Sequence, residues 1–352
     1  MNIAKSLGLT DEAFCRMVLT TKMLLSNVLG HAAELHYEKD LISKKLRYTK
    51  APTDVPYDYI VEGKKDQVKR FETSSTNTKY VGVNLTKTHG DRSGSGAFYT
   101  RGDFERLVIL DVGLSNTYII EEKNIPDNSS YPGSLPGKFR VRRDLEKNLV
   151  FETQFLETMK FANSAFPEKI EELREKYHYC YVDLLSKSCD LSIEEIDSLF
   201  CFDNFRLIVG AKGFAGEEHF NMLLEKNNIP YKQMKDMYSK HDHLIKDKIR
   251  VQVKTPHGRS MDDEYYGFKT HKSHGHGVGE LIKKDEFDYI ALYVGFDMNE
   301  EYDKYMPKSA KTEFIFIPAE DLEEHPDHPG YLKRVTRILR SKYKINDLST
   351  LK

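Results

Sequence analysis

The chain has 352 residues, of which 39% are hydrophobic and 31% charged, and its formal net charge is −2. This composition supplies enough apolar and aromatic surface to build folded cores, so it excludes a disordered chain. The length predicts about two domains. The near-zero net charge excludes a global polycation or a strongly acidic protein.

Two further absences bear on where the protein works. No stretch approaches roughly 18 consecutive apolar residues, and the N-terminus lacks the layout of a secretory signal.

The four cysteines form no C-x-x-C pair, which argues against a structural zinc or a disulfide scaffold. They are Cys15, Cys180, Cys189 and Cys201. We therefore expect reduced thiols in a cytoplasmic protein with no membrane segment.

The second half of the chain repeats the first. Segments match in the same order at offsets between 182 and 185 residues, and the offset grows after an insertion near residues 297–311. The matches place Gly30–Tyr37 over Gly213–Phe220, Asp58–Lys69 over Asp242–Lys254, Thr88–Gly90 over Ser273–Gly275, Leu107–Gly113 over Ile290–Gly295, and Tyr131–Gly133 over His328–Gly330. The shared order indicates a tandem duplication.

Within each copy the same elements are predicted in the same order. Helices come first, and Ser192-Ile193-Glu194-Glu195 has the pattern of a capping box. A hairpin follows, with strands at 57–61 and 67–71 in the first copy and at 242–245 and 249–254 in the second. A Gly-, Ser- and His-rich stretch then leads to an apolar run that is typical of a buried strand. This order predicts an α/β (α+β) fold in which a small mixed sheet is flanked by helices.

The repeat sets the predicted domain boundaries. The first domain covers residues 1–150 and the second covers 189–352. Residues 151–188 are predicted to form an acidic helical linker, because apolar residues recur there at helical spacing. The second domain is predicted to end in a basic helix, because Lys333, Arg337, Arg340 and Lys344 would line one helical face.

Four polar positions recur in both copies and are candidates for metal binding and catalysis. They are Glu34, Asp58, Gln67 and Lys69, and then Glu217, Asp242, Gln252 and Lys254. Residues two apart on a strand face the same side, so each Gln and Lys point together, and a short hairpin brings the Asp beside them. The helical Glu is expected to close over the same end of the sheet. Such a cluster of hard oxygen ligands suits Mg²⁺, with the Lys placed to hold and deprotonate an attacking water.

At these residues the sequence resembles the PD-(D/E)xK nuclease superfamily, in the variant that reads Glu…Asp…Gln-x-Lys. The resemblance covers roughly residues 30–112 and 213–295. Neither Asp directly follows a proline, which departs from the superfamily pattern, although Pro56 lies two residues before Asp58.

The resemblance implies a role for each of the repeated residues. Asp58 and Asp242 would be the main metal ligands, and Gln67 and Gln252 would take the second ligand position. Lys69 and Lys254 would orient the water, while Glu34 and Glu217 would be the helix-borne carboxylates. Mg²⁺ would be the cofactor.

Candidate DNA contacts lie in two kinds of segment. Polar loops follow each site strand, at residues 70–101 and 255–284, and basic segments lie near the end of each copy. The candidates are Lys87, His89, Arg92, Arg259, Lys272 and His274 in the loops, and Arg140, Arg142, Lys333 and Arg337 in the basic segments. Paired basic segments in a near-neutral protein are typical of a charged groove that binds nucleic acid.

The resemblance implies a Mg²⁺-dependent endonuclease for double-stranded DNA, most like a type II restriction endonuclease. Two sites in one chain predict a monomeric pseudo-dimer that makes double-strand breaks, one site per strand. A cognate DNA methyltransferase encoded separately would be its partner. The alternatives are a homing, junction-resolving or nicking nuclease on the same scaffold, and a DNA-binding module without catalysis.

Overall fold

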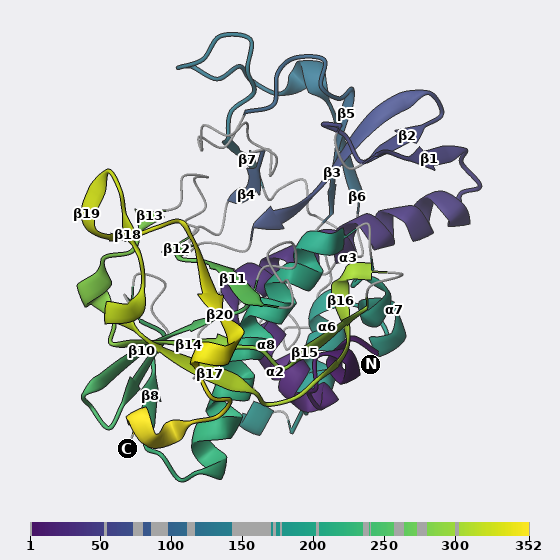
Figure 1. The fold of residues 1–352 in the computed structure, drawn as a ribbon. Coiled ribbons are helices and arrows are strands. Elements are labelled where there is room, and N and C mark those ends of the chain that lie inside the picture. Colours follow the sequence, from purple (N-terminus) through teal and green to yellow (C-terminus); the bar gives the residue numbers. More distant parts are fainter. Residues whose placement is uncertain are drawn as a thin grey trace. The chain divides into compact units, whose positions relative to one another are not determined.

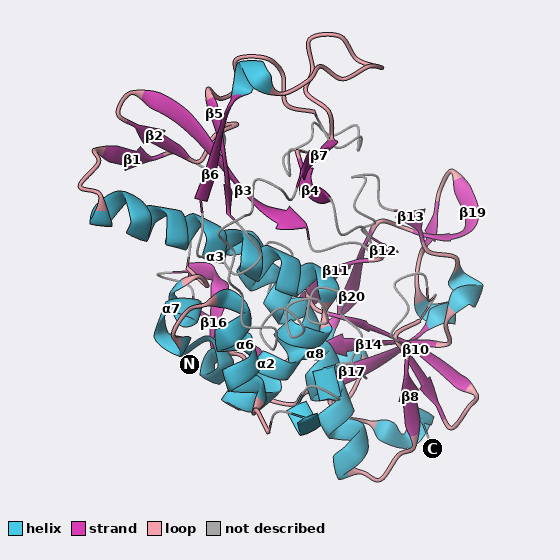
Figure 2. Cartoon of the chain, turned by 180° about the vertical axis from the view of Figure 1, so that it is seen from behind, coloured by secondary structure: helices cyan, strands magenta, loops and turns pink. Residues whose placement is uncertain are grey.

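The computed structural model describes residues 2–52, 55–72, 80–85, 98–110, 117–142, 170–171, 174–176, 178–201, 204–234, 239, 241–256, 264–272, 280–299 and 303–351 (Figure 1). They form two compact units. One is Cys15–Leu207, and the other combines Asn2–Phe14 with Ile208–Lys352. Each unit holds mixed β-structure flanked by helices (Figure 2), so the predicted α+β fold is confirmed. That each unit is a nuclease domain, with boundaries at 150 and 189, stays a prediction.

The N-terminal half of the chain contains three helices and seven strands in its described part. They are α1 (Asn2–Ser6), α2 (Asp11–Thr20), α3 (Lys22–Ser43), β1 (Tyr48–Lys50), β2 (Tyr59–Val61), β3 (Lys64–Glu72), β4 (Tyr80–Asn84), β5 (Arg106–Leu110), β6 (Thr117–Glu121) and β7 (Lys138–Arg142), with the 3-10 helix η1 (Glu122–Asn124) after β6. The strands form one sheet of order β1-β2-β3-β4-β7, in which β5 pairs with β3 and β6 with β5.

The C-terminal half begins with helices α6 (Tyr181–Cys189), α7 (Ile193–Ser198) and α8 (Phe205–Lys226). Its main sheet has the order β17-β14-β10-β9-β8, formed by β8 (Tyr231–Gln233), β9 (His243–Ile245), β10 (Ile249–Lys254), β14 (Tyr289–Tyr293) and β17 (Phe314–Pro318). In the described part of this half, four two-stranded ribbons accompany it: β11 (Tyr265–Lys269) with β20 (Val335–Leu339), β12 (His271–Lys272) with β13 (Glu280–Leu281), β15 (Phe296–Asn299) with β16 (Asp303–Ala310), and β18 (Glu324–His325) with β19 (His328–Leu332). The 3-10 helices are η5 (Lys284–Glu286), η6 (Ala319–Asp321), η7 (Arg340–Lys342) and η8 (Leu348–Leu351).

The two halves share one connectivity. Strands β1-β2-β3-β5-β6 and β8-β9-β10-β14-β17 are joined in the same way, with one parallel pair in each, β3 with β5 and β10 with β14. A helix of 22 residues, α3 or α8, precedes each set. Gly133 and Gly330, matched by the repeat, both adopt left-handed φ values, +79° and +81°. The duplication predicted from the sequence is therefore present in the backbone.

Each long helix packs against the hairpin of its own unit. In the second unit, Phe220 and Leu224 of α8 share a buried cluster with Ile245, Val251 and Ala291 of the sheet. Burial of these side chains supplies the hydrophobic contribution that holds helix and sheet together.

In the first unit, the ring of Tyr37 on α3 lies edge-on to Tyr59, with centroids 5.6 Å apart. The Tyr37 hydroxyl donates to the fully buried Asp66 at 2.6 Å, and Arg106 pairs with the same carboxylate at 2.6 Å. The buried charge of Asp66 is therefore compensated. The helix that carries Glu34 is thereby fixed to the strand that carries Gln67 and Lys69.

The predicted helical linker is described only in part, because residues 151–169 lie outside the described segments. Residues 181–188 are helical, within α6. The capping box predicted at Ser192 is confirmed: Ser192 Oγ accepts from the main-chain N–H of Glu195, whose carboxylate accepts from the N–H of Ser192.

The predicted basic C-terminal helix is wrong. Val335–Leu339 form strand β20, and only Arg340–Lys342 form a turn of 3-10 helix. Thr336 and Ile338 are buried while Val335, Arg337 and Leu339 are exposed. Burial therefore alternates at a period of two along this segment. The β-branched residues Val335, Thr336 and Ile338 favour a strand, and this preference outweighs the helical spacing of the charges.

The N-terminal residues belong to the second unit. His219 Nε2, on α8, lies 2.7 Å from the carbonyl oxygen of Leu7, and the His219 ring stacks on Tyr293. At Gly8, with φ +68°, an added Cβ would lie 2.9 Å from the carbonyl oxygen of Ala310. Residues 2–14 therefore pack against this unit and form part of it. Among the described residues, no helix combines the length and apolarity needed to cross a membrane.

We expect Gly8→Ala to destabilise the protein more than Gly63→Ala. A Cβ added at Gly63, with φ +82°, would extend into open space, so this substitution costs only the left-handed backbone preference of about 1 to 2 kcal/mol. Gly8→Ala adds the close contact with Ala310 and His219. Urea unfolding followed by circular dichroism measures the free energy of unfolding of both variants. Equal losses of this free energy would contradict the packing of residues 2–14 against the second unit.

Candidate active site

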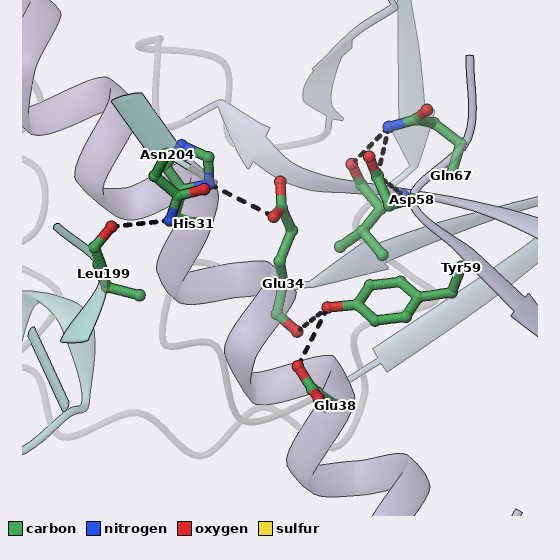
Figure 3. A network of polar contacts seen from close by, with 9 residues as sticks. His31, Glu34, Glu38, Asp58, Tyr59, Gln67, Leu199 and Asn204 are labelled. Atoms are coloured by element: carbon green, nitrogen blue, oxygen red, sulfur yellow. Dashed lines mark hydrogen bonds and ion pairs between the residues drawn. The ribbon is translucent and has the colours of Figure 1, made fainter. Parts of the chain in front are cut away.

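The first candidate site lies where α3 meets the β2–β3 hairpin. Asp58, just before β2, accepts two hydrogen bonds at Oδ2, from Gln67 Nε2 at 2.5 Å and from the main-chain N–H of Val68 at 2.7 Å. Glu34, on α3, points toward this hairpin (Figure 3). Lys69 follows Gln67 on the same side of β3. The structure therefore brings together the four residues that the sequence singled out in the first copy.

The second candidate site repeats this arrangement on α8 and the β9–β10 hairpin. Asp242 Oδ2 accepts from Gln252 Nε2 and, at 2.7 Å, from the main-chain N–H of Val253. Glu217 stands on α8, and Gln233 Nε2 lies 3.5 Å from its Oε2 atom. Lys254 follows Gln252 on β10. The same donors hold the same carboxylate in both copies, which independent surface hairpins would not be expected to do.

The two carboxylates of each site lie close enough to affect one another. Burial raises the pKa of Asp58 to about 7, and the negative charge of Glu34 adds to the shift. Burial likewise raises the pKa of Glu217 to about 8, with the charge of Asp242 adding to it. Buried like charges in one site destabilise a fold, and such pairs are typical of functional sites.

The surroundings of the two sites differ. Burial by itself would raise the pKa of Glu34, but a hydrogen bond with His31, 3.3 Å away, and the charges of His31, Lys50 and Lys69 bring it below its usual range. The positions equivalent to His31 and Lys50 hold Phe214 and Gln233. The first Glu therefore has a histidine and a second lysine beside it, where the second Glu has Phe214 and Gln233.

Lys69 also has a neighbour that the sequence did not reveal. Its Nζ lies 5.6 Å from the ring centroid of Tyr99, which is buried. Burial alone would lower the pKa of Lys69, but Tyr99, Asp58 and Glu34 outweigh it and raise the pKa. Lys69 is therefore held as a cation that donates hydrogen bonds. Its removal of a proton from water stays a prediction. At the repeat offset Tyr99 corresponds to Ile282.

Sequence reasoning missed His31, Lys50 and Tyr99. The repeat offset held one usable signal: Lys50 and Gln233 are polar residues at the same position of β1 and β8, and both act on the helical Glu.

The residues present fit a divalent cation. Each site has two mutually repelling carboxylates, and Gln252 Oε1 is buried without a hydrogen-bond partner in the described part of the chain. No group of three or more His, Cys, Asp and Glu side chains is placed to hold a metal among the described residues. The protein would thus supply two carboxylates and an amide oxygen, a set that suits Mg²⁺ because this ion keeps several waters.

The predicted DNA contacts are only partly described. Lys87, His89, Arg92, Arg259 and His274 lie outside the described residues, and Lys272, Arg140 and Arg142 lie on strands whose side chains are not described there. Lys333 forms an ion pair with Glu323. Arg337 is exposed on β20, with its guanidinium 4.9 Å from the ring centroid of Tyr265.

Comparison with known proteins adds little. No protein-family model matches this chain, and neither does any curated protein sequence. Among solved structures, the bacterial homing endonuclease I-Ssp6803I aligns with 42% of this chain and 93% of its own, at 16% sequence identity and a TM-score of 0.26. A match this loose assigns no residue and no activity.

We expect Glu217→Gln to stabilise the metal-free protein at alkaline pH. The pKa of Glu217, about 8, lies above its ordinary value of 4.5, so the carboxyl stabilises the fold while protonated, and this contribution is lost as the pH rises through about 8. In EDTA, the melting temperature of the variant should exceed that of the wild type by a margin that grows between about pH 5 and pH 9.

Glu225→Gln is the matched control, because Glu225 is an exposed carboxylate near the end of the same helix. Its melting temperature should track the wild type at every pH. A constant offset between Glu217→Gln and the wild type would mean that the Glu217 carboxyl keeps its ordinary pKa.

Proposed function

We propose that the protein is a divalent-metal-dependent DNA endonuclease with two active sites in one chain. The observation that carries this proposal is the repeated constellation of an Asp held by a Gln amide and a main-chain N–H, a helix-borne Glu, and a Lys two residues beyond the Gln. An ordinary pair of hairpins gains nothing from keeping partly buried carboxylate pairs twice, because their repulsion costs stability. Chemistry at the site explains why both copies keep them.

Each residue of a site would have its own role in the reaction. Asp58 with Gln67, and Asp242 with Gln252, would hold Mg²⁺, which supplies stabilisation of the charge that develops on the phosphate oxygens. The two N–H donors fix each Asp carboxylate before any substrate arrives. Lys69, protonated because its pKa is raised, orients the attacking water by hydrogen bonding and places a positive charge beside the phosphate.

The substrate class that suits two sites in one chain is duplex DNA, with one site acting on each strand. We favour a type II restriction endonuclease that acts as a monomeric pseudo-dimer, for which a separately encoded DNA methyltransferase would protect the host's DNA. A symmetric homodimer is confined to symmetric targets, whereas a fused pair is not. Homing or junction-resolving activity would show as a long target site or as preference for branched duplexes.

A nicking enzyme is the second candidate, and one observation favours it. His31, Lys50 and Tyr99 surround the first site, whereas Phe214, Gln233 and Ile282 occupy those positions in the second. Sites with such different charge environments can differ in activity, so one copy would cut while the other only binds.

Unmodified plasmid or phage DNA incubated with Mg²⁺ should give discrete fragments on a gel, and EDTA should abolish them. The reason is that, in this proposal, the bound cation stabilises the charge that develops on the phosphate oxygens. Sequencing the fragment ends would give the target and the stagger. DNA that is bound but stays uncut with Mg²⁺ would leave the non-catalytic binding module as the function.

Replacing one site lysine at a time should convert the enzyme into a nickase. Lys69→Ala removes the cation of the first site and Lys254→Ala that of the second, so each should cut only one strand, with a loss at the altered site of about a hundredfold or more. The readout is conversion of supercoiled plasmid to open circles instead of linear DNA, and the double variant should be inactive.

Lys65→Ala and Lys248→Ala are the matched controls, because both lysines are exposed on the same two hairpins and lie outside the sites. They should cut both strands. If only one of Lys69→Ala and Lys254→Ala changes the products, the nicking interpretation replaces the two-site enzyme.

A further inference from the structure

Each copy carries an antiparallel ribbon in which a glycine lies directly opposite an arginine. In β11–β20, Gly267 pairs with Arg337, and in β4–β7, Gly82 pairs with Arg140. A tyrosine stands two residues before each glycine, at positions 265 and 80. The strands of each ribbon come from distant parts of the sequence, so the agreement in register is a property of the fold. The ribbons are therefore equivalent parts of the two copies.

The second ribbon has one face in the core and one in solvent. Phe268 and Ile338 belong to a buried cluster that also contains Leu292 of β14, the strand beside β10. On the other face, Val335 and Leu339 are 50% and 45% exposed on either side of the exposed Arg337. The ribbon is thus fixed to the sheet that carries Gln252 and Lys254. On its outer face, Arg337 lies between the apolar residues Val335 and Leu339.

The charge of the ribbons is of one sign. None of the four strand sequences contains Asp or Glu, whereas they contain Lys138, Arg140, Arg142, Lys269 and Arg337. Stacking on Tyr265 restricts the guanidinium of Arg337, which lowers the entropy that it loses on binding. A cationic ribbon of this kind is complementary to a polyanion.

We propose that these two ribbons are the base-reading elements of the protein, with Arg337 and Arg140 each reading a guanine in the major groove of DNA. This inference rests on the proposed function for its substrate. The major groove of B-DNA, about 12 Å wide, admits a two-stranded ribbon, and the arginine fork matches the O6 and N7 acceptors of guanine. The glycine opposite each arginine places no side chain beside it on that face of the ribbon.

The residues beside each arginine differ between the copies. Lys138 and Arg142 take the alternate positions on β7, whereas Val335 and Leu339 take them on β20. Cations suit phosphates and guanines, while exposed apolar side chains suit the methyl group of thymine. The target therefore has a guanine in each half, with a thymine preference only in the half that β20 reads.

Binding-site selection tests this proposal without requiring catalysis. A duplex library with a randomised segment is bound in EDTA by the wild-type protein and by Arg337→Lys, which keeps the charge and loses the fork. We expect the variant to lose roughly tenfold to a hundredfold preference for one guanine in one half-site. Its affinity for random DNA and the salt dependence of that affinity should match the wild type, because the charge is unchanged.

Three further variants complete the design. Arg140→Lys should lose a guanine in the other half-site, and Leu339→Ala should weaken a thymine preference beside the Arg337 guanine. Arg334→Lys is the matched control, since Arg334 is exposed and lies just outside β20. Its selected sequence should be that of the wild type, and thermal melting verifies that each variant is folded.

The outcomes separate this inference from the proposed function. Three results would each overturn the proposal that the ribbons read bases. The first is an unchanged base preference in both arginine variants. The others are an equal loss of affinity for all DNA sequences, or a change in self-association instead of DNA selection. If the wild-type protein selects a sequence through these arginines but leaves it uncut with Mg²⁺, the ribbon stands and the endonuclease fails.

Discussion

The arrangement of both sites depends on one interaction, the double hydrogen bond to the Asp at the open end of each hairpin. One donor is the Gln amide and the other is the main-chain N–H between the Gln and the Lys. Because the second donor belongs to the backbone, the tie fixes the strand itself and not only a side chain. Gln and Lys must then project from the same side of that strand, beside the carboxylate.

The same tie explains a difference in spacing between the copies. The Asp and the Gln lie 9 residues apart in the first copy and 10 in the second. The added residue falls in the turn, which comprises Glu62 and Gly63 in one hairpin and residues 246–248 in the other. A residue added inside a strand would turn every later side chain to the opposite face, whereas the turn absorbs it. The pairing of Asp, Gln and Lys therefore survives the insertion.

The repeat made the helix, hairpin and parallel strand of each copy predictable, because two weak patterns in one order reinforce each other. It also predicted which four residues meet. What it could not predict is the contact of Lys69 with Tyr99, which joins distant parts of the sequence through packing. His31 lies three residues before Glu34 on the same helix, a local spacing that the sequence does contain. The equivalent positions of the second copy hold Phe214 and Ile282. The helix predicted for residues 335–339 was wrong because it rested on the spacing of charged residues alone. In the structure, the buried side chains of Thr336 and Ile338 alternate with exposed ones, as in a strand.

Fusion of two copies in one chain changes what each part is free to do. In a homodimer every substitution appears twice, so a change that suits one half of a target is imposed on the other. Here the Asp, Gln, Lys and Glu of both sites are kept, while the residues beside Arg140 and Arg337 have diverged to cations in one copy and apolar residues in the other. Shared hydrogen bonds constrain the members of each partly buried site, whereas Val335 and Leu339 are apolar side chains that face solvent. The four site residues are therefore shared by both copies, whereas the side chains around them and on the outer faces of the strands differ, because fewer hydrogen bonds of the fold constrain those positions.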